Sequence, residues 1–190
     1  LDMRSGTERL AYALIIVTVA TMTAWILAML LGLKPIAFLP LDLALWQWIL
    51  LRMLFSFCGV FGFSIMFNSP VRLATAAGLI GAVSNTLRLE LIDLYAIPPA
   101  AAAFIGAFLA GILASTLKGV AGYPRISLTV PSIVIMVPGL YLYKGFYNLG
   151  IMELATAASW LASALLIILA LPLGLIFARI ATDKTFRYCT

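Results

Sequence analysis

The sequence predicts an all-α, polytopic integral membrane protein with about six transmembrane helices, one of them broken by proline. Hydrophobic residues make up 64% of the chain and charged residues only 10%, a composition typical of membrane proteins rather than of a soluble domain. Several apolar segments also reach the roughly 20 residues that a helix needs to cross a bilayer. One of these segments contains two separated prolines, which interrupt a regular helix.

Composition also limits the function. The chain has no histidine, which removes the usual metal ligand, general base and proton relay. Its two cysteines, Cys58 and Cys189, lack the spacing of a metal site or a redox motif. We therefore expect no metal, no other cofactor and no enzyme. The net charge of +5 is distributed over short loops, so it bears on membrane orientation and we expect no nucleic-acid partner.

Three parts are expected along the chain. Residues 1–42 form an additional N-terminal transmembrane helix with its connection, residues 43–180 form the main membrane domain, and residues 181–190 form a cytoplasmic tail. The uncharged segment 10–33 is longer than the roughly 7–15 apolar residues of a signal peptide, so we expect it to be retained as a helix.

The second predicted span, residues 43–67, begins with Trp46 and Trp48, which suit the membrane interface. Arg52 lies inside this span, less than three helical turns from the interfacial end. The favoured interpretation is that its side chain extends to the interface. The alternative is a buried ion pair or a contact with substrate.

The third predicted span, residues 71–93, carries two polar stripes at helical spacing. The stripes consist of Gly81, Ser84, Asn85 and Arg88 on one face and of Thr86, Glu90 and Asp93 on the neighbouring face. A charged group at membrane depth costs roughly 2.5–3.5 kcal/mol, so it usually faces a cavity or another charge. The alternative is that Arg88, Glu90 and Asp93 form the solvated end of a short helix.

Small residues dominate the fourth predicted span, residues 96–117. They recur every four residues in two parallel stripes, which allows helices to approach backbone to backbone. Gly106, Ala110 and Gly111 are the positions that we expect to pack against neighbouring helices.

The fifth stretch, residues 126–145, contains Pro131 and the pair Pro138 and Gly139. One interpretation is a proline-kinked packing helix. The other is a discontinuous helix, in which irregular backbone lines a cavity and half-helix ends point at a solute. The last predicted span, residues 154–180, completes an even number of crossings. Both termini then share a side with most basic residues, which predicts that both lie in the cytoplasm.

Three stretches together resemble the threonine/serine exporter family, and specifically the shorter subunit of its split, two-chain form. They are residues 61–72 (FGFSIMFNSPVR), residues 81–88, and residues 130–139 (VPSIVIMVPG) with Tyr143 after them. The resemblance covers roughly residues 43–180. Asn85 departs from the pattern, because some relatives have histidine there, and segment 10–33 lies outside the matched region.

The resemblance implies efflux of small hydroxy amino acids across a bacterial plasma membrane, coupled to protons, with a larger exporter-family chain or a second copy as partner. A related two-subunit system exports dicarboxylates such as succinate, so the substrate class stays open. The resemblance also favours the discontinuous helix. The alternative from another functional class is a scaffold subunit that does not itself transport a solute. An intramembrane enzyme is not favoured, because no catalytic motif is present.

The expected site combines backbone and side chains. Amides freed around Pro138 and Gly139 would hold a carboxylate, as helix N-termini do. Glu90 or Asp93 would carry the coupling proton. The expected substrate-binding residues are Ser84, Asn85, Arg88, Pro131, Ser132, Pro138 and Gly139.

Overall fold

The computed structural model describes residues 3–32 and 43–183, which contain seven helices and no strand. The prediction of an all-helical, polytopic membrane protein is confirmed. Contacts divide the chain into two compact units, residues 1–42 and 43–190, and each is described here by itself. In the part of the first unit that the structure describes, one long helix is present, α1 (Met3–Leu30), on which large apolar side chains such as Tyr12 and Ile16 are exposed.

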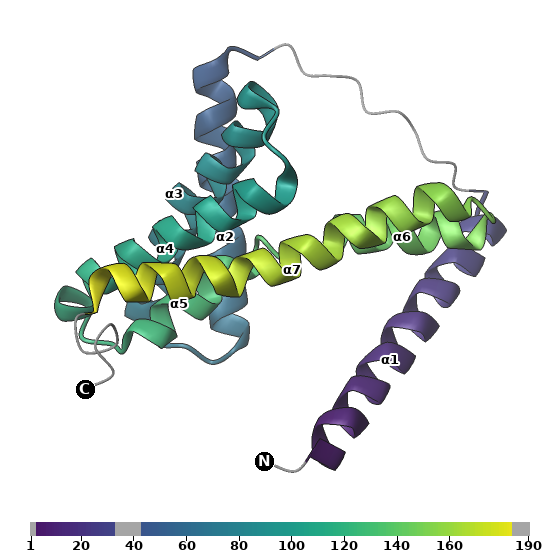
Figure 1. The fold of residues 1–190 in the computed structure, drawn as a ribbon, viewed down its shortest axis with the longest axis horizontal. Coiled ribbons are helices and arrows are strands. Elements are labelled where there is room, and N and C mark those ends of the chain that lie inside the picture. The colour runs from purple at the N-terminus through teal and green to yellow at the C-terminus, as the bar shows by residue number, and fades with distance from the viewer. Residues whose placement is uncertain (1–2, 33–42, 184–190) are drawn as a thin grey trace. The chain divides into compact units, whose positions relative to one another are not determined.

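The second unit contains the other six helices (Figure 1). They are α2 (Leu45–Met66), α3 (Val71–Tyr95), α4 (Pro99–Ala121), α5 (Arg125–Val134), α6 (Gly139–Gly150) and α7 (Leu154–Thr182). Proline suits the first turn of a helix, where no N–H is needed. Accordingly, α4 begins at Pro99 with Pro98 as its cap.

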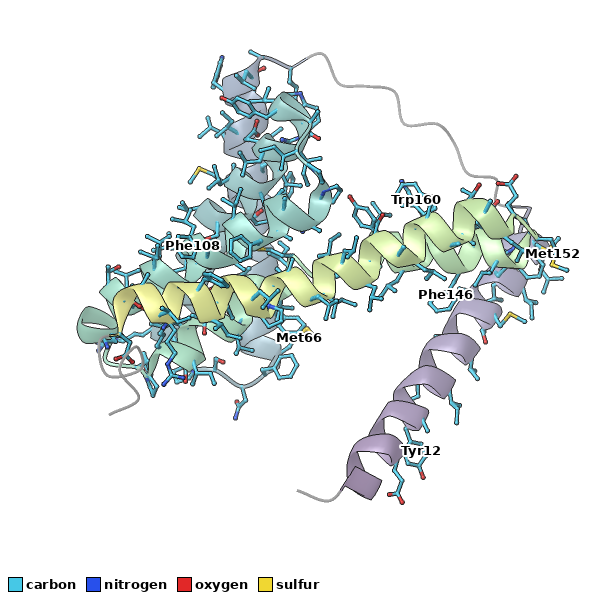
Figure 2. All side chains as sticks on the ribbon, viewed as in Figure 1. Tyr12, Met66, Phe108, Phe146, Met152 and Trp160 are labelled. Atoms are coloured by element: carbon cyan, nitrogen blue, oxygen red, sulfur yellow. The ribbon has the colours of Figure 1, made fainter. Side chains whose placement is uncertain are left out.

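Four helical segments are long and apolar enough to cross a membrane. They are α2, α4, α7 and the segment Arg125–Gly150, which contains both α5 and α6. Large apolar side chains stay exposed on these helices, including Met66 and Phe146 (Figure 2), as expected for surfaces that face lipid. α1 and α3 are not among the four, and α3 carries Arg72, Arg88, Glu90 and Asp93. These two helices therefore remain predicted spans.

Helix α4 lies at the centre of the unit, packed against α3, α5 and α7. One of the two predicted small-residue stripes consists of residues 102, 106, 110 and 114, and its three alanines, at 102, 110 and 114, are fully buried. Where α4 meets α7 the backbones nearly touch, since a Cβ on Gly174 would lie 2.5 Å from the Phe104 carbonyl oxygen. Likewise, a Cβ on Gly111 would lie 2.5 Å from that of Ala178. The small residues therefore serve contacts between helices of this same chain.

The fifth predicted span is discontinuous. α5 ends at Val134 and α6 begins at Gly139. Pro138 explains the break, because proline has no N–H, clashes with the carbonyl four residues earlier and keeps the preceding residue out of the α region. Pro131 does not break the helix, since it lies inside α5. The discontinuous interpretation is therefore confirmed, with the break at residues 135–138.

The chain reverses direction between α6 and α7, so that α6 runs alongside the first half of α7 (Figure 1). The contact is close, because a Cβ on Gly145 would lie 2.6 Å from Leu161 Cδ2. The second half of α7 packs on α4 instead. α7 thus changes its neighbour near its middle, at the level where the chain breaks between α5 and α6.

Candidate functional site

A cavity of about 400 Å³ lies beside the helix break, within the range of about 300–1,000 Å³ that is typical of small-ligand sites. Its wall combines one face of α3, the start of α4, the break itself, the first turn of α6 and one residue of α7. The lining residues are Arg88, Leu89, Ile92, Asp93, Pro99, Ile135, Val137, Pro138, Gly139, Leu140, Tyr141 and Ile167. Most of the wall is apolar, so its few polar groups determine what it binds.

Arg88 provides the positive charge of this cavity. Its Nη1 donates a hydrogen bond to the Met136 carbonyl in the break, at 2.9 Å. Its Nε is buried and has no acceptor among the described residues. No carboxylate of the described chain lies within ion-pair distance of Arg88 either. An arginine has five N–H donors in a planar fork that suits a carboxylate, and this one retains donors for a ligand.

Two backbone amides at the start of α6, those of Leu140 and Tyr141, provide hydrogen-bond donors in addition to Arg88. The first helical amide, of Gly139, donates to the Val137 carbonyl, and the amide of Leu142 donates to the Pro138 carbonyl. Between them, the amides of Leu140 and Tyr141 donate to no acceptor in the described part of the chain. Free N–H groups at a helix N-terminus attract anions, because the helix dipole has its positive end there.

Aromatic contacts fix the first turns of α6 against α7. The Tyr141 ring lies edge-on to Trp160 of α7, with the centroids 5.5 Å apart. Lys144 Nζ lies 4.4 Å from the centroid of the same indole, within the range of a cation–π contact. Figure 2 labels Trp160 on the part of α7 that runs beside α6. These contacts hold the Leu140 and Tyr141 amides in place beside the cavity.

The predicted site residues separate into two groups. Arg88, Asp93, Pro138 and Gly139 line the cavity. Five other predicted residues are not among its lining residues: Ser84, Asn85, Glu90, Pro131 and Ser132.

Most residues of the second group serve contacts between helices. Asn85 is 4% exposed, and its Nδ2 donates to Ser56 Oγ of α2 at 2.8 Å. Ser132 Oγ is buried beside the Leu128 carbonyl and the Ala77 carbonyl of α3. A Cβ on Gly106 would lie 3.2 Å from the Ser84 carbonyl oxygen, so this part of α3 packs against α4.

Arg52 forms an ion pair, as its alternative interpretation expected, but the pair is partly exposed rather than buried, and the interfacial position favoured from the sequence stays a prediction. Arg52 Nη1 lies 2.8 Å from Glu90 Oε1, and its Nη2 contacts Asp93 Oδ2. Its side chain is 21% exposed, and its guanidinium also lies 5.6 Å from the Trp48 ring centroid. The reason is the packing of α2 against α3, which brings Arg52 within reach of two acids one turn apart.

Sequence reasoning missed Leu140, Tyr141 and Ile167 as parts of the site. The two α6 residues follow directly from the break at Pro138, because the residues after a helix start carry the free amides. Ile167 has no such signal, since it is one apolar residue in a long apolar helix and only the tertiary packing brings it to the cavity.

Of three comparisons with known proteins, one finds a match. Residues 52–181 match the family described as "Threonine/Serine exporter, ThrE". No curated protein matches the chain. No solved structure matches it either.

Proposed function

The chain belongs to the threonine/serine exporter family, and from that premise we propose that it is a membrane transporter subunit that exports threonine and serine. One observation carries this proposal. The unpaired amides of Leu140 and Tyr141 and the partly buried Arg88 line the same cavity at a break in a candidate membrane span. Broken helices with free N-termini hold the carboxylates of small solutes in several transporter folds.

The cavity supports recognition of the carboxylate in particular. A carboxylate can accept hydrogen bonds from a guanidinium and from backbone amides together, and such charge-assisted bonds are among the strongest available to a protein. The apolar wall formed by Leu89, Ile92, Ile135, Val137 and Ile167 strengthens these bonds by excluding water. A volume of about 400 Å³ accommodates a small amino acid with a few waters, each of which occupies about 30 Å³.

We further propose that export is coupled to protons through Glu90. Its carboxylate is 13% exposed and is held by Arg52. Neutralising it would weaken the ion pair that joins α2 to α3, two residues after Arg88 on α3. Protonation would in this way be transmitted to the helix that forms one wall of the cavity.

We also propose that the chain lies in a bacterial plasma membrane with both termini in the cytoplasm. Arg72, Lys118 and Arg125 lie at helix ends, beside the connections from α2 to α3 and from α4 to α5, and they support this orientation. A larger exporter-family chain or a second copy would complete the transporter. Accessibility of single cysteines, placed in the loop before α5 and in the loop before α7, to an impermeant reagent tests the orientation.

Uptake of labelled threonine into everted membrane vesicles tests the proposed function. The vesicles contain the chain with its native membrane partners and are energised to be acid inside. We expect uptake that a protonophore abolishes and that unlabelled serine inhibits. Inhibition by succinate without any threonine flux would instead identify a dicarboxylate exporter. Absence of both fluxes, in vesicles shown to contain the chain, would favour a scaffold subunit.

Arg88→Gln provides the matched variant for this assay. It removes the guanidinium charge while keeping a hydrogen-bond donor near the Met136 carbonyl. We expect the half-saturating threonine concentration to rise about tenfold or more, as loss of a hydrogen bond to a charged group predicts. Arg179→Gln is the control, since Arg179 lies in the last turn of α7 and does not line the cavity. Unchanged threonine saturation in the Arg88 variant would contradict the proposed site.

A further inference from the structure

The cavity contains a negative group in addition to Arg88 and the α6 amides. Asp93 is one of its lining residues, five positions after Arg88 on α3. At 1.5 Å per residue, this places the two residues about 7.5 Å apart along the helix axis. Leu89 and Ile92 lie between them on the same wall. The charges of Arg88 and Asp93 are thus separated by an apolar surface of about one and a half turns.

Asp93 has capacity to bind a ligand even though it is ion-paired. Arg52 Nη2 contacts only its Oδ2 atom. Its Oδ1 atom accepts no hydrogen bond in the described part of the chain, and the side chain is 51% exposed. An ionised carboxylate accepts about four hydrogen bonds. Arg52 therefore fixes the direction of this carboxylate and leaves one of its oxygens available.

From this arrangement, which rests on the proposed function, we propose that Asp93 is the specificity-determining residue of the cavity. Its Oδ1 accepts the ammonium group of a zwitterion whose carboxylate is held by Arg88 and the α6 amides. A dicarboxylate would bring its second negative charge toward Asp93, and like charges at close range disfavour the wrong ligand. A hydroxy acid without an ammonium group would leave Asp93 without a ligand partner. The cavity therefore selects α-amino acids over dicarboxylates and hydroxy acids.

Glu90 does not replace Asp93 in this role. Glu90 is less exposed, is held by Arg52 through the other arm of the guanidinium, and is not among the lining residues. The ion pair between Glu90 and Arg52 also makes Asp93→Asn an informative variant. When Asp93 is changed to Asn, Arg52 keeps its 2.8 Å ion pair with Glu90, so the guanidinium is not left unpaired. Asp93→Asn thus removes one charge from the cavity with little change in volume.

Two threonine analogues separate the charges of the substrate. 3-Hydroxybutyrate retains the carboxylate and the hydroxyl group but lacks the ammonium group, and 1-amino-2-propanol lacks the carboxylate. Each is used as a competitor of labelled threonine, in transport by vesicles and in binding to the purified complex. The wild-type protein is expected to bind threonine at least about tenfold more tightly than either analogue, as loss of one charge-assisted contact predicts.

In Asp93→Asn, the half-saturating threonine concentration should rise about tenfold or more. 3-Hydroxybutyrate should then compete as well as threonine, while discrimination against 1-amino-2-propanol stays. Asp93→Glu, which retains the charge, should keep the preference for threonine. Glu153→Gln is the control, since it removes an exposed acid at the start of α7, away from the cavity.

Two results would overturn the inference. One is an Asp93→Asn protein that still prefers threonine to 3-hydroxybutyrate. The other result concerns the wild-type protein alone: it would bind threonine and 3-hydroxybutyrate equally well. A wild-type protein that neither binds nor transports any of these compounds would overturn the proposed function, and the inference with it. Threonine transport that depends on Arg88 but not on Asp93 would leave the proposed function standing and refute only the inference.

Discussion

Arg52 of α2 and Glu90 of α3 form an ion pair at 2.8 Å, and Glu90 lies two residues after Arg88, the arginine that lines the cavity. A pair in this position joins the helix that forms a wall of the cavity to a helix that does not contact the cavity. Opening or closing the pair is therefore a direct way to move α3 relative to α2.

Glu90→Gln imitates the protonated state of this carboxylate permanently. We expect flux that no longer responds to a pH gradient across the vesicle membrane, with the complex still assembled, because Asp93 continues to hold Arg52. The measurement is the initial rate of threonine uptake at imposed pH gradients of increasing size. Glu153→Gln, which also replaces one glutamate by glutamine, is the control. Full pH-driven transport by Glu90→Gln would remove Glu90 from the coupling mechanism.

The hydrogen bond between Asn85 Nδ2 and Ser56 Oγ predicts a structural coupling. In a double-mutant cycle with Asn85→Ala and Ser56→Ala, we expect a coupling of about 0.6 kcal/mol, and at most about 1.7, as measured between membrane helices. The observable is the free energy of unfolding in detergent. Additive single effects would refute the coupling.

The same two variants test the prediction that Asn85 binds substrate. Its Oδ1 is buried and has no hydrogen-bond partner among the residues that the structure describes, and Asn85 does not line the cavity. If its role is to join α2 and α3, both variants change threonine saturation equally or not at all. A rise in the half-saturating concentration with Asn85→Ala alone would restore Asn85 to the site.

Gly174→Ala tests the close approach of α7 to α4. The added Cβ would meet the Phe104 carbonyl oxygen at 2.5 Å and the Phe108 nitrogen at 3.0 Å, and neither backbone atom moves without its helix. We expect a loss of about 1–3 kcal/mol in the free energy of unfolding, typical of overpacking. Gly62→Ala is the control, because no atom of the described residues lies within 4 Å of its Cβ position. Equal stability of both variants would contradict this packing.

Much of the fold follows from local sequence signals. The expected break follows from the chemistry of proline, and Pro138 fixes its position because it acts on the residues before it. Pro131 carries the same chemistry, but α5 tolerates it, so the count of prolines does not by itself locate a break. The buried small residues of α4 follow from their four-residue spacing, although the sequence does not say which helix covers each stripe.

The site was predictable only where one helix determines it. Arg88 and Asp93 share a wall because both belong to α3, and Pro138 and Gly139 lie together because they are consecutive where the break ends and α6 begins. Ser132 and Asn85 were expected in the site because they are polar at membrane depth, but each hydrogen-bonds a neighbouring helix instead. The partners of Arg52 lie 38 and 41 positions further along the chain, and no local pattern connects them.

The central claim is that free amides at the start of α6 hold the carboxylate of the substrate. Leu140→Pro removes one of these N–H groups at a position in the first turn where proline is compatible with a helix, whereas Leu140→Ala keeps it. Equilibrium binding of labelled threonine to the purified complex compares the two. We predict that Leu140→Pro weakens binding about tenfold or more relative to Leu140→Ala. Equal affinity of the two variants would contradict the claim.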